Sequence, residues 1–243
     1  MASGSSTQVW KMIQKLGHQI EPPVPSLFTF NINSKEIHAL AGLSVDDVRV
    51  KIEKSKTITQ GPLLFTHWGL SAPSILKLSA AEAPLLNSLD YKFKIIVDFI
   101  PSVNEEQLRL ILENTQRTST KNMYNHNELG LAKRFWAYLL NYASVPNDRI
   151  WAELRKSERL SLVNSLKRMS YQVNGKSTFK EEFVTAGGIK LKGVDFKSME
   201  SRSNPGLFFC GEVLNIDGYT GGFNFQAAWS TAFLTASAIS KKV

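Results

Sequence analysis

The stretch from residue 206 to residue 226 reads GLFFCGEVLNIDGYTGGFNFQ, and it decides the fold. Its first eight residues, 206–213, are mostly apolar and predict a buried strand that ends at Gly211 and Glu212. A loop with three more glycines follows, and residues 224–240 predict a helix rich in small side chains. Eight of the 15 glycines lie between 187 and 222, which indicates a backbone that turns sharply or closely approaches a ligand.

A glycine-rich loop that leads into a helix can bind negative charge. The first backbone N–H groups of a helix have no partner within it, and they lie at the positive end of the helix dipole. The Glu212 carboxylate, at the predicted strand end beside the loop, can accept hydrogen bonds from sugar or polyol hydroxyls. The alternative interpretation is a hairpin turn followed by a helix that packs tightly on a sheet.

The composition is that of a globular chain. The 243 residues are 43% hydrophobic and 21% charged, and the formal net charge is +8. A single cysteine, Cys210, excludes an internal disulfide and a Cys-x-x-Cys pair, and four scattered histidines argue against structural zinc. We expect Cys210 to be a buried apolar side chain of the predicted strand. The positive charge suits a polyanion, a phosphate-bearing cofactor, or no specific partner.

Targeting and membrane signals are weak. No run approaches the roughly 18 apolar residues of a membrane span. The serine-rich start has no apolar signal core, so it does not resemble a targeting peptide. We therefore expect a soluble protein, cytoplasmic by default, with no membrane partner.

The first hundred residues predict strands and short helices. Apolar spacing over 9–16 predicts a helix that Gly17 ends. Residues 22–25, PPVP, predict a stiff linker, and Ser71 is the expected N-cap of a helix with Pro73 in its first turn. Strands are predicted in four apolar or alternating stretches, 27–37, 47–52, 63–65 and 91–100.

The pattern changes to helical spacing after Pro101. Ser102 and Glu105 have the spacing of a capping box, and residues 104–169 predict three or four helices. Strand signals return at 179–185. The helical block carries 11 basic and 7 acidic residues. A solvated helical face explains this charge, and without a recognised motif a nucleic-acid surface is the weaker interpretation.

Several segments resemble, in order, the HI0933-like (YhiN/BaiN-type) flavoproteins, a family of FAD- and NAD(P)H-linked oxidoreductases. The resemblance covers nearly the whole chain, and the sequence of residues 25–30, PSLFTF, is closer to plant or cyanobacterial members than to enteric ones. The matching segments are 4–18, ending in LGH; 64–73, LFTHWGLSAP; 183–189, FVTAGGI; 199–201; 205–218; 220–226; and 228–230.

The resemblance implies an α+β and α/β architecture. A Rossmann-like FAD domain would contribute residues 1–24 and 203–243. A β-barrel-like domain inserted in it would comprise 25–103 and 171–202, and a helical bundle nested in that domain would comprise 104–170. The order of predicted strands and helices agrees with this division.

The resemblance also implies roles for residues of the loop. Glu212 would bind the ribityl chain or nearby sugar hydroxyls, and the turn 220–224 with the helix after it would lie against the pyrimidine edge of the isoalloxazine. A helix N-terminus there favours the anionic reduced flavin. The expected cofactor-binding residues are Gly211, Glu212, Asp217, Gly218, Thr220, Gly221, Gly222, Phe223 and Asn224.

Two residues outside the loop have a functional and a structural interpretation. His67 follows a predicted strand, so it is the candidate catalytic residue as a proton donor or substrate contact near the flavin; the alternative is a structural histidine. Ser71 fits an N-cap better than a nucleophile, since no Gly-x-Ser-x-Gly surrounds it.

The chain departs from the family at its start. It has no Gly-x-Gly-x-x-Gly, the dinucleotide-binding motif that a Rossmann-like FAD domain places at a helix N-terminus. We therefore expect a truncated chain that corresponds to the C-terminal portion of such a flavoprotein. Missing sheet strands would leave apolar surface uncovered, for which a partner chain is the expected cover.

Two functions follow from the sequence. The first is an FAD-dependent, NAD(P)H-linked oxidoreductase with an unknown small-molecule substrate and no metal. The alternative is a catalytically inactive fragment that binds a partner chain or an anion. If the source is a plant, a plastid location is the alternative to the cytoplasm.

Overall fold

The computed structural model describes residues 7–177 and 184–241, which form two compact units. Unit 1 comprises residues up to Phe28, Leu76–Tyr91 and the chain from Ser177 onward. Unit 2 comprises Thr29–Ile75 and Lys92–Lys176. The chain therefore passes between the units four times, and α3 (Pro73–Ala81) begins in unit 2 and ends in unit 1.

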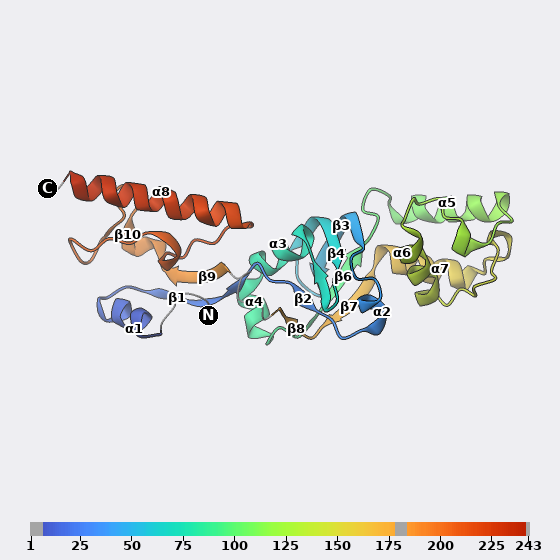
Figure 1. Ribbon diagram of the computed structural model, residues 1–243, viewed down its shortest axis with the longest axis horizontal. Coiled ribbons are helices and arrows are strands. Elements are labelled where there is room, and N and C mark those ends of the chain that lie inside the picture. The colour runs from blue at the N-terminus through green and yellow to red at the C-terminus, as the bar shows by residue number, and fades with distance from the viewer. Residues whose placement is uncertain (1–6, 178–183, 242–243) are drawn as a thin grey trace. The chain divides into compact units, whose positions relative to one another are not determined.

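Unit 2 is built on a seven-stranded sheet in which every neighbouring pair is antiparallel (Figure 1). The spatial order is β7-β6-β3-β4-β5-β2-β8. The strands are β2 (Phe30–Asn31), β3 (Ser44–Ile52), β4 (Ile58–Phe65), β5 (Gly69–Ser71), β6 (Phe93–Asp98), β7 (Met169–Val173) and β8 (Gly175–Lys176).

The sheet curls on itself like a barrel. Its two edge strands, β7 and β8, are consecutive in the chain and separated only by Asn174, so one extended segment pairs with β6 on one side and β2 on the other. The rings of Phe30 on β2 and Phe93 on β6 lie 5.1 Å apart, edge to face. The two ends of the sheet therefore share one core.

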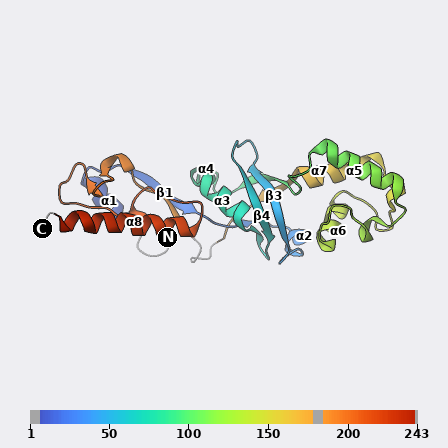
Figure 2. The same cartoon turned by 90° about the horizontal axis from the view of Figure 1, so that it is seen from above.

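Alternation places the apolar side chains of the long β3–β4 hairpin (Figure 2) inside this core. Val48, Val50 and Ile52 are buried, whereas Arg49 between them is exposed. Gly69 of β5 has φ +151°, and a Cβ there would lie 2.0 Å from the carbonyl oxygen of Phe30. Only glycine permits that close approach between β5 and β2.

The helical block of unit 2 lies between β6 and β7 in the chain. It contains α5 (Glu105–Thr118), the 3₁₀ turn η1 (Met123–Asn125), α6 (Lys133–Tyr142), η2 (Trp151–Glu153) and α7 (Lys156–Lys167). Its core holds the nearly parallel indoles of Trp136 and Trp151, 6.2 Å apart. Lys167 joins the block to the sheet, because its Nζ lies 2.7 Å from Asp98 Oδ2.

Unit 1 has a smaller core around two-stranded pairings. Its elements are α1 (Thr7–Lys15), β1 (Ile20–Ser26), α4 (Ala83–Ser88), β9 (Val184–Ile189), η4 (Leu191–Gly193), β10 (Val194–Asp195), β11 (Glu200–Ser201), η5 (Gly211–Val213) and α8 (Gly221–Ser240). β1 pairs with β9, and β10 with β11. No helix within 7–177 and 184–241 is long and apolar enough to cross a membrane.

A buried histidine holds several loops of unit 1 together. His18 Nε2 lies 3.0 Å from Ser201 Oγ, which also accepts hydrogen bonds from the backbone N–H groups of Ser203 and Asn204. The His18 ring packs edge to face on Phe209. The hydrogen bond offsets the cost of burying this ring nitrogen, so His18 helps to hold these loops together.

The structure corrects the predicted strand at 206–213. This stretch forms only an isolated bridge, between Phe208 and Glu200, and then the 3₁₀ turn η5. Cys210 is exposed rather than buried. Gly211 has φ +75°, a conformation that turns the chain and ends any extended run.

Other boundaries differ as well. The predicted linker at 22–25 lies within β1, and the pairing of β1 with β9 shifts register between Glu21 and Val24, where two prolines have no N–H to donate. The predicted strand 27–37 contains only the two-residue β2 and then the short α2 (Lys35–His38). The predicted strand 179–185 lies partly outside the described residues, and β9 begins at Val184.

The caps were also misplaced. Ser71 is the last residue of β5, and Ala72, with φ +84°, precedes α3. The N-cap of α5 is Asn104, not Ser102. Helix α1 agrees with the prediction for 9–16, and α8 begins three residues earlier than predicted.

Candidate functional site

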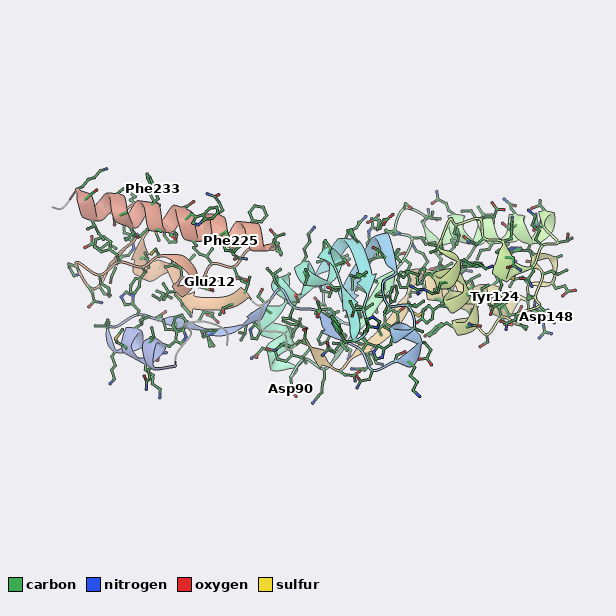
Figure 3. The ribbon with its side chains drawn as sticks, viewed as in Figure 1. Asp90, Tyr124, Asp148, Glu212, Phe225 and Phe233 are labelled. Carbon is green, nitrogen blue, oxygen red and sulfur yellow. The ribbon has the colours of Figure 1, made fainter. Side chains whose placement is uncertain are left out.

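The glycine-rich loop connects η5 to α8 within unit 1, and α8 runs alongside η5 (Figure 1). The backbone N–H of Gly211 donates to Thr231 Oγ1 at 3.0 Å, which ties the start of η5 to the third turn of α8. Glu212 follows on η5 with its side chain exposed (Figure 3). Its carboxylate is therefore free to accept hydrogen bonds from a polyol beside α8.

The Asn224 side chain holds the loop against the first turn of α8. Its Oδ1 accepts from the Gly218 backbone N–H at 2.8 Å, and its Nδ2 donates to the Thr220 carbonyl at 2.9 Å. Asn224 is buried. A Cβ on Gly218 would lie 2.6 Å from Cβ of Phe223, so only glycine allows the loop to close this tightly.

The first turn of α8 is nevertheless open on its outer side. Thr220 is the N-cap, and its side chain makes no capping hydrogen bond. A Cβ on Gly221 would meet nothing within 4 Å, and one on Gly222 would meet only Thr220 Oγ1 at 4.0 Å. Open space beside the first turn of this 20-residue helix lets a negative charge approach the positive end of the helix dipole.

Asp217 is the acidic residue of the loop. Desolvation raises the pKa of its carboxyl above the ordinary value of 3.8. The carboxylate is thus less stable there than in water, so a hydroxyl or an N–H group that binds to it would be favoured.

All but one of the predicted site residues lie in unit 1. The loop residues from Asp217 to Asn224 lie around the start of α8, whereas Gly211, with Glu212 next to it, lies beside the third turn of the same helix. His67 lies in unit 2, exposed in the turn between β4 and β5. Its assignment as a catalytic residue remains a prediction.

The aromatic side chains of α8 do not pack into unit 1. Trp229 is 67% exposed and Phe233 72% exposed, and the Phe225 ring stacks on Trp229 at 6.1 Å. Phe225 and Phe233 lie along the helix in Figure 3. The side toward η5 instead carries small residues such as Thr231, so the wide apolar face of α8 is the one left uncovered.

The sequence did not predict a cavity of about 970 Å³ in unit 2, between α2, α6 and β7. Ile37, Leu40 and Tyr171 form its buried floor, and amide side chains surround its mouth. Arg134, Tyr138 and Tyr142 line it from α6. Their four-residue spacing puts them on one helix face, which is the signal in the sequence that could have identified the cavity.

Burial raises the pKa of the two inner tyrosines of this cavity. Desolvation raises the pKa of Tyr171 well above 10.0, and it also raises the pKa of Tyr138. The Tyr138 hydroxyl lies 3.4 Å from that of Tyr171. Both are therefore neutral phenols at physiological pH.

Within 7–177 and 184–241, no group of three or more His, Cys, Asp or Glu side chains could hold a metal ion.

Comparison with known proteins identifies relatives over nearly the whole chain. Residues 24–184 match the family model described as the HI0933-like protein barrel and H2TH domain. A ribosomal RNA dihydrouridine synthase of Haemophilus influenzae is 29% identical over 98% of this chain and 57% of its own length. The enzyme of the same name in Escherichia coli is 30% identical over 96% of this chain and 56% of its own length.

A third relative is named for another substrate. The 3-dehydro-bile acid delta(4,6)-reductase of Clostridium scindens is 24% identical over 98% of this chain and 59% of its own length. The chain thus spans little more than half the length of these curated relatives. Two of the three names refer to RNA, so a nucleic-acid partner, which the sequence patterns disfavoured, is not excluded.

Proposed function

Because the chain belongs to the HI0933-like family, we propose that it forms part of an FAD-dependent reductase that takes electrons from NAD(P)H. The segment from Gly211 to Asn224 would contribute to the flavin site. The observation that carries this proposal is the open, uncapped first turn of α8 at Gly221 and Gly222. FAD, when bound, supplies the hydride chemistry, and the protein supplies placement and field.

Each loop residue has a distinct role in this proposal. The N–H groups of Gly221, Gly222 and Phe223 would stabilise negative charge on the reduced isoalloxazine, by about 0.3–1 kcal/mol and up to ~2 in a shielded geometry. Glu212 would accept hydrogen bonds from the ribityl hydroxyls. Asn224 would position the turn rather than touch the flavin, since its amide already holds Gly218 and Thr220.

We assign RNA as the substrate class. The names of all three relatives describe products or reactions in which a carbon–carbon double bond near a carbonyl is reduced. Two are named for ribosomal RNA, and these have the higher identities. The basic helical block of unit 2 supports a polyanion over a sterol. The reaction would add hydrogen across the double bond of a uracil base.

Flavin binding is tested with the purified chain. Titration with FAD, followed by flavin fluorescence, should give saturable binding, and Glu212→Ala should raise the dissociation constant about tenfold, since it removes a charge-assisted hydrogen bond of ~1.5 kcal/mol. Glu53→Ala, an exposed carboxylate of unit 2, is the control and should leave binding unchanged. Absence of any FAD uptake by the chain, or an unchanged constant for Glu212→Ala, would reject the assigned site.

Substrate class is tested separately. With FAD, NADPH and single-stranded RNA containing uracil, the RNA should gain the mass of one hydrogen molecule per reacted base. NADPH oxidation without a change in RNA mass would retain the flavin reductase and exclude RNA as the substrate.

A second candidate function is a module that binds a partner chain. The exposed aromatic face of α8 favours it, because exposed apolar surface of this kind marks interaction sites. A colourless protein that takes up no FAD but forms a stable complex through α8 would support this function over the first.

A further inference from the structure

The cavity between α2, α6 and β7 has the features of a site for a flat polar ring. Its volume of about 970 Å³ lies at the upper end of the range for ligand sites. None of the residues that line it belongs to the segment assigned to the flavin. Any ligand in this cavity would therefore be held by residues other than those assigned to the flavin.

The aromatic wall of the cavity comes from one face of α6. Tyr138 packs nearly parallel to the buried Phe135, with 6.2 Å between ring centroids. Tyr142, one turn further along, is 53% exposed, and its ring lies 6.4 Å from that of Tyr138. Packing on Phe135 fixes Tyr138, whereas Tyr142 at the mouth is available to stack on an incoming ring.

The polar groups at the mouth are amides with part of their hydrogen-bonding capacity unused. Asn141 Oδ1 accepts from the Tyr124 hydroxyl at 2.6 Å, and Asn174 Oδ1 accepts from the Asn33 backbone N–H at 3.2 Å. Gln172 Nε2 donates to two backbone carbonyls. These bonds leave two NH₂ groups and one carbonyl oxygen, that of Gln172, for a ligand. A nucleobase edge presents adjacent donors and acceptors that match such a set.

The charge beside the cavity suits a phosphate backbone. Arg134 lines the cavity with its guanidinium held by the carbonyl oxygens of Leu40 and Ala41, at 3.1 and 3.0 Å. Lys133 precedes it on α6 and is exposed. The one carboxylate in the lining, Glu36, keeps its negative charge, which the neighbouring Lys35 partly offsets; it also accepts from Ser34 Oγ at 2.6 Å. Cations near an aromatic wall are the usual means of binding single strands.

We propose that this cavity binds an unpaired base of single-stranded RNA, stacked on Tyr142 and Tyr138, with its edge on the amides and its phosphates beside Lys133 and Arg134. The choice of RNA as the ligand rests on the proposed function, whereas the fit of the cavity to a flat polar ring rests on the aromatic wall and the amides alone. The site anchors RNA and performs no chemistry. Because a base in a duplex is already stacked on both faces, the site selects unpaired segments.

The test measures binding of a fluorescein-labelled oligouridylate to the full chain by fluorescence anisotropy. Wild type should bind the single strand, and adding complementary oligoadenylate to form a duplex should weaken binding. Tyr142→Ala should raise the dissociation constant about tenfold, since stacking on an aromatic side chain is worth about 1–3 kcal/mol per base. Tyr142→Phe should restore binding, because the ring face remains.

Leu110→Ala is the matched control, since Leu110 has the same exposed fraction, 53%, on another helix of the block. It should bind like wild type. Equal binding by Tyr142→Ala and wild type, equal binding of duplex and single strand, or no RNA binding at all would each overturn the proposal. FAD titration of Tyr142→Ala separates the two assignments, since flavin binding should not change. If the chain takes up no FAD but binds RNA in a way that depends on Tyr142, the reductase proposal is rejected and the RNA site is retained.

Discussion

At the scale of single residues, Lys167 joins the helical block of unit 2 to its sheet through an ion pair and two hydrogen bonds. Its ammonium group contacts Asp98 Oδ2 at 2.7 Å and donates to the carbonyls of Ile100 and Val103 at 3.1 and 2.7 Å. The side chain is only 10% exposed. Three partners satisfy all of its donors, so the pair is well compensated despite its burial.

Lys167→Ala should therefore lower the free energy of unfolding by about 3 kcal/mol, because it leaves the Asp98 carboxylate partly buried without its cation. Urea denaturation followed by circular dichroism measures the loss. Lys156→Ala, at the exposed start of the same helix, is the control and should change stability by less than about 0.5 kcal/mol. Equal losses in both variants would contradict this role of Lys167.

Tyr171 gives the protein an alkaline sensitivity. Its pKa is raised well above 10.0 in the folded protein, chiefly by desolvation, whereas in the unfolded chain the phenol ionises near 10.0. Above that pH the unfolded state releases a proton that the folded state retains. Its contribution to stability is thus complete below pH 10 and lost as pH rises further.

Tyr171→Phe should consequently make the decline of stability above pH 10 less steep, because the phenyl ring keeps the packing and has no proton to release. Thermal melts of both proteins on either side of pH 10 measure the difference. An equally steep decline in Tyr171→Phe would show that other groups cause the sensitivity.

At the scale of elements, the start of α5 is capped by a different pair of residues from the pair that the sequence pattern predicts. Ser102 and Glu105 have capping-box spacing, but the structure uses Asn104 and Gln107 for the same reciprocal pair. Asn104 Oδ1 accepts from the Gln107 backbone N–H at 2.8 Å, and Gln107 Oε1 accepts from that of Asn104 at 3.0 Å. Spacing cannot decide between two overlapping caps, because both offer similar local bonds.

Asn104→Ala should lower the free energy of unfolding by about 1 kcal/mol, the usual value of an N-cap side chain, and Ser102→Ala should have almost no effect. Denaturation of the two variants under the same conditions checks the assignment. A larger loss in Ser102→Ala than in Asn104→Ala would restore the cap that the spacing predicts.

Local patterns predicted the elements best where local bonds decide them. The end of α1 just before Gly17 and the alternation over 47–52 were confirmed, since a helix stop and a half-buried strand are encoded within a few residues. The segment 22–25 was predicted wrongly, because its strand conformation depends on pairing with β9, far along the chain. The strand propensity of a segment does not indicate which distant strand it pairs with.

For the candidate site too, the sequence predicted the locally encoded feature and missed the one that depends on tertiary structure. Glycine clustering located the loop at the start of α8, since tight turns and close approach need glycine wherever they occur. The same sequence predicted a buried strand over 206–213 and missed the exposure of Cys210. An apolar run indicates burial against something, and the partner of that run is decided by tertiary structure.

At the scale of the whole molecule, the two units differ in how they use apolar surface. The core of unit 2 combines large aromatic and aliphatic side chains of the sheet and the helical block. In unit 1, one small cluster of buried side chains includes Ile13, Met199 and Leu214. Val9 and Met12 of α1 and all four aromatic residues of α8 remain exposed. We therefore expect the exposed apolar surface of unit 1 to be the one that contacts other chains.

We expect the isolated chain to self-associate at micromolar concentration through α8, because Phe225, Trp229 and Phe233 recur every four residues and form a continuous exposed stripe. The double change Trp229→Gln with Phe233→Gln should shift the sedimentation coefficient toward that of the monomer. It should not reduce helix content, since neither ring packs into unit 1 and glutamine is a good helix former. The comparison double change, Leu110→Gln with Leu160→Gln, removes exposed leucines from unit 2 and should leave self-association intact. A monomeric wild type, or association that survives loss of both α8 rings, would mean that the stripe does not hold copies of the chain together.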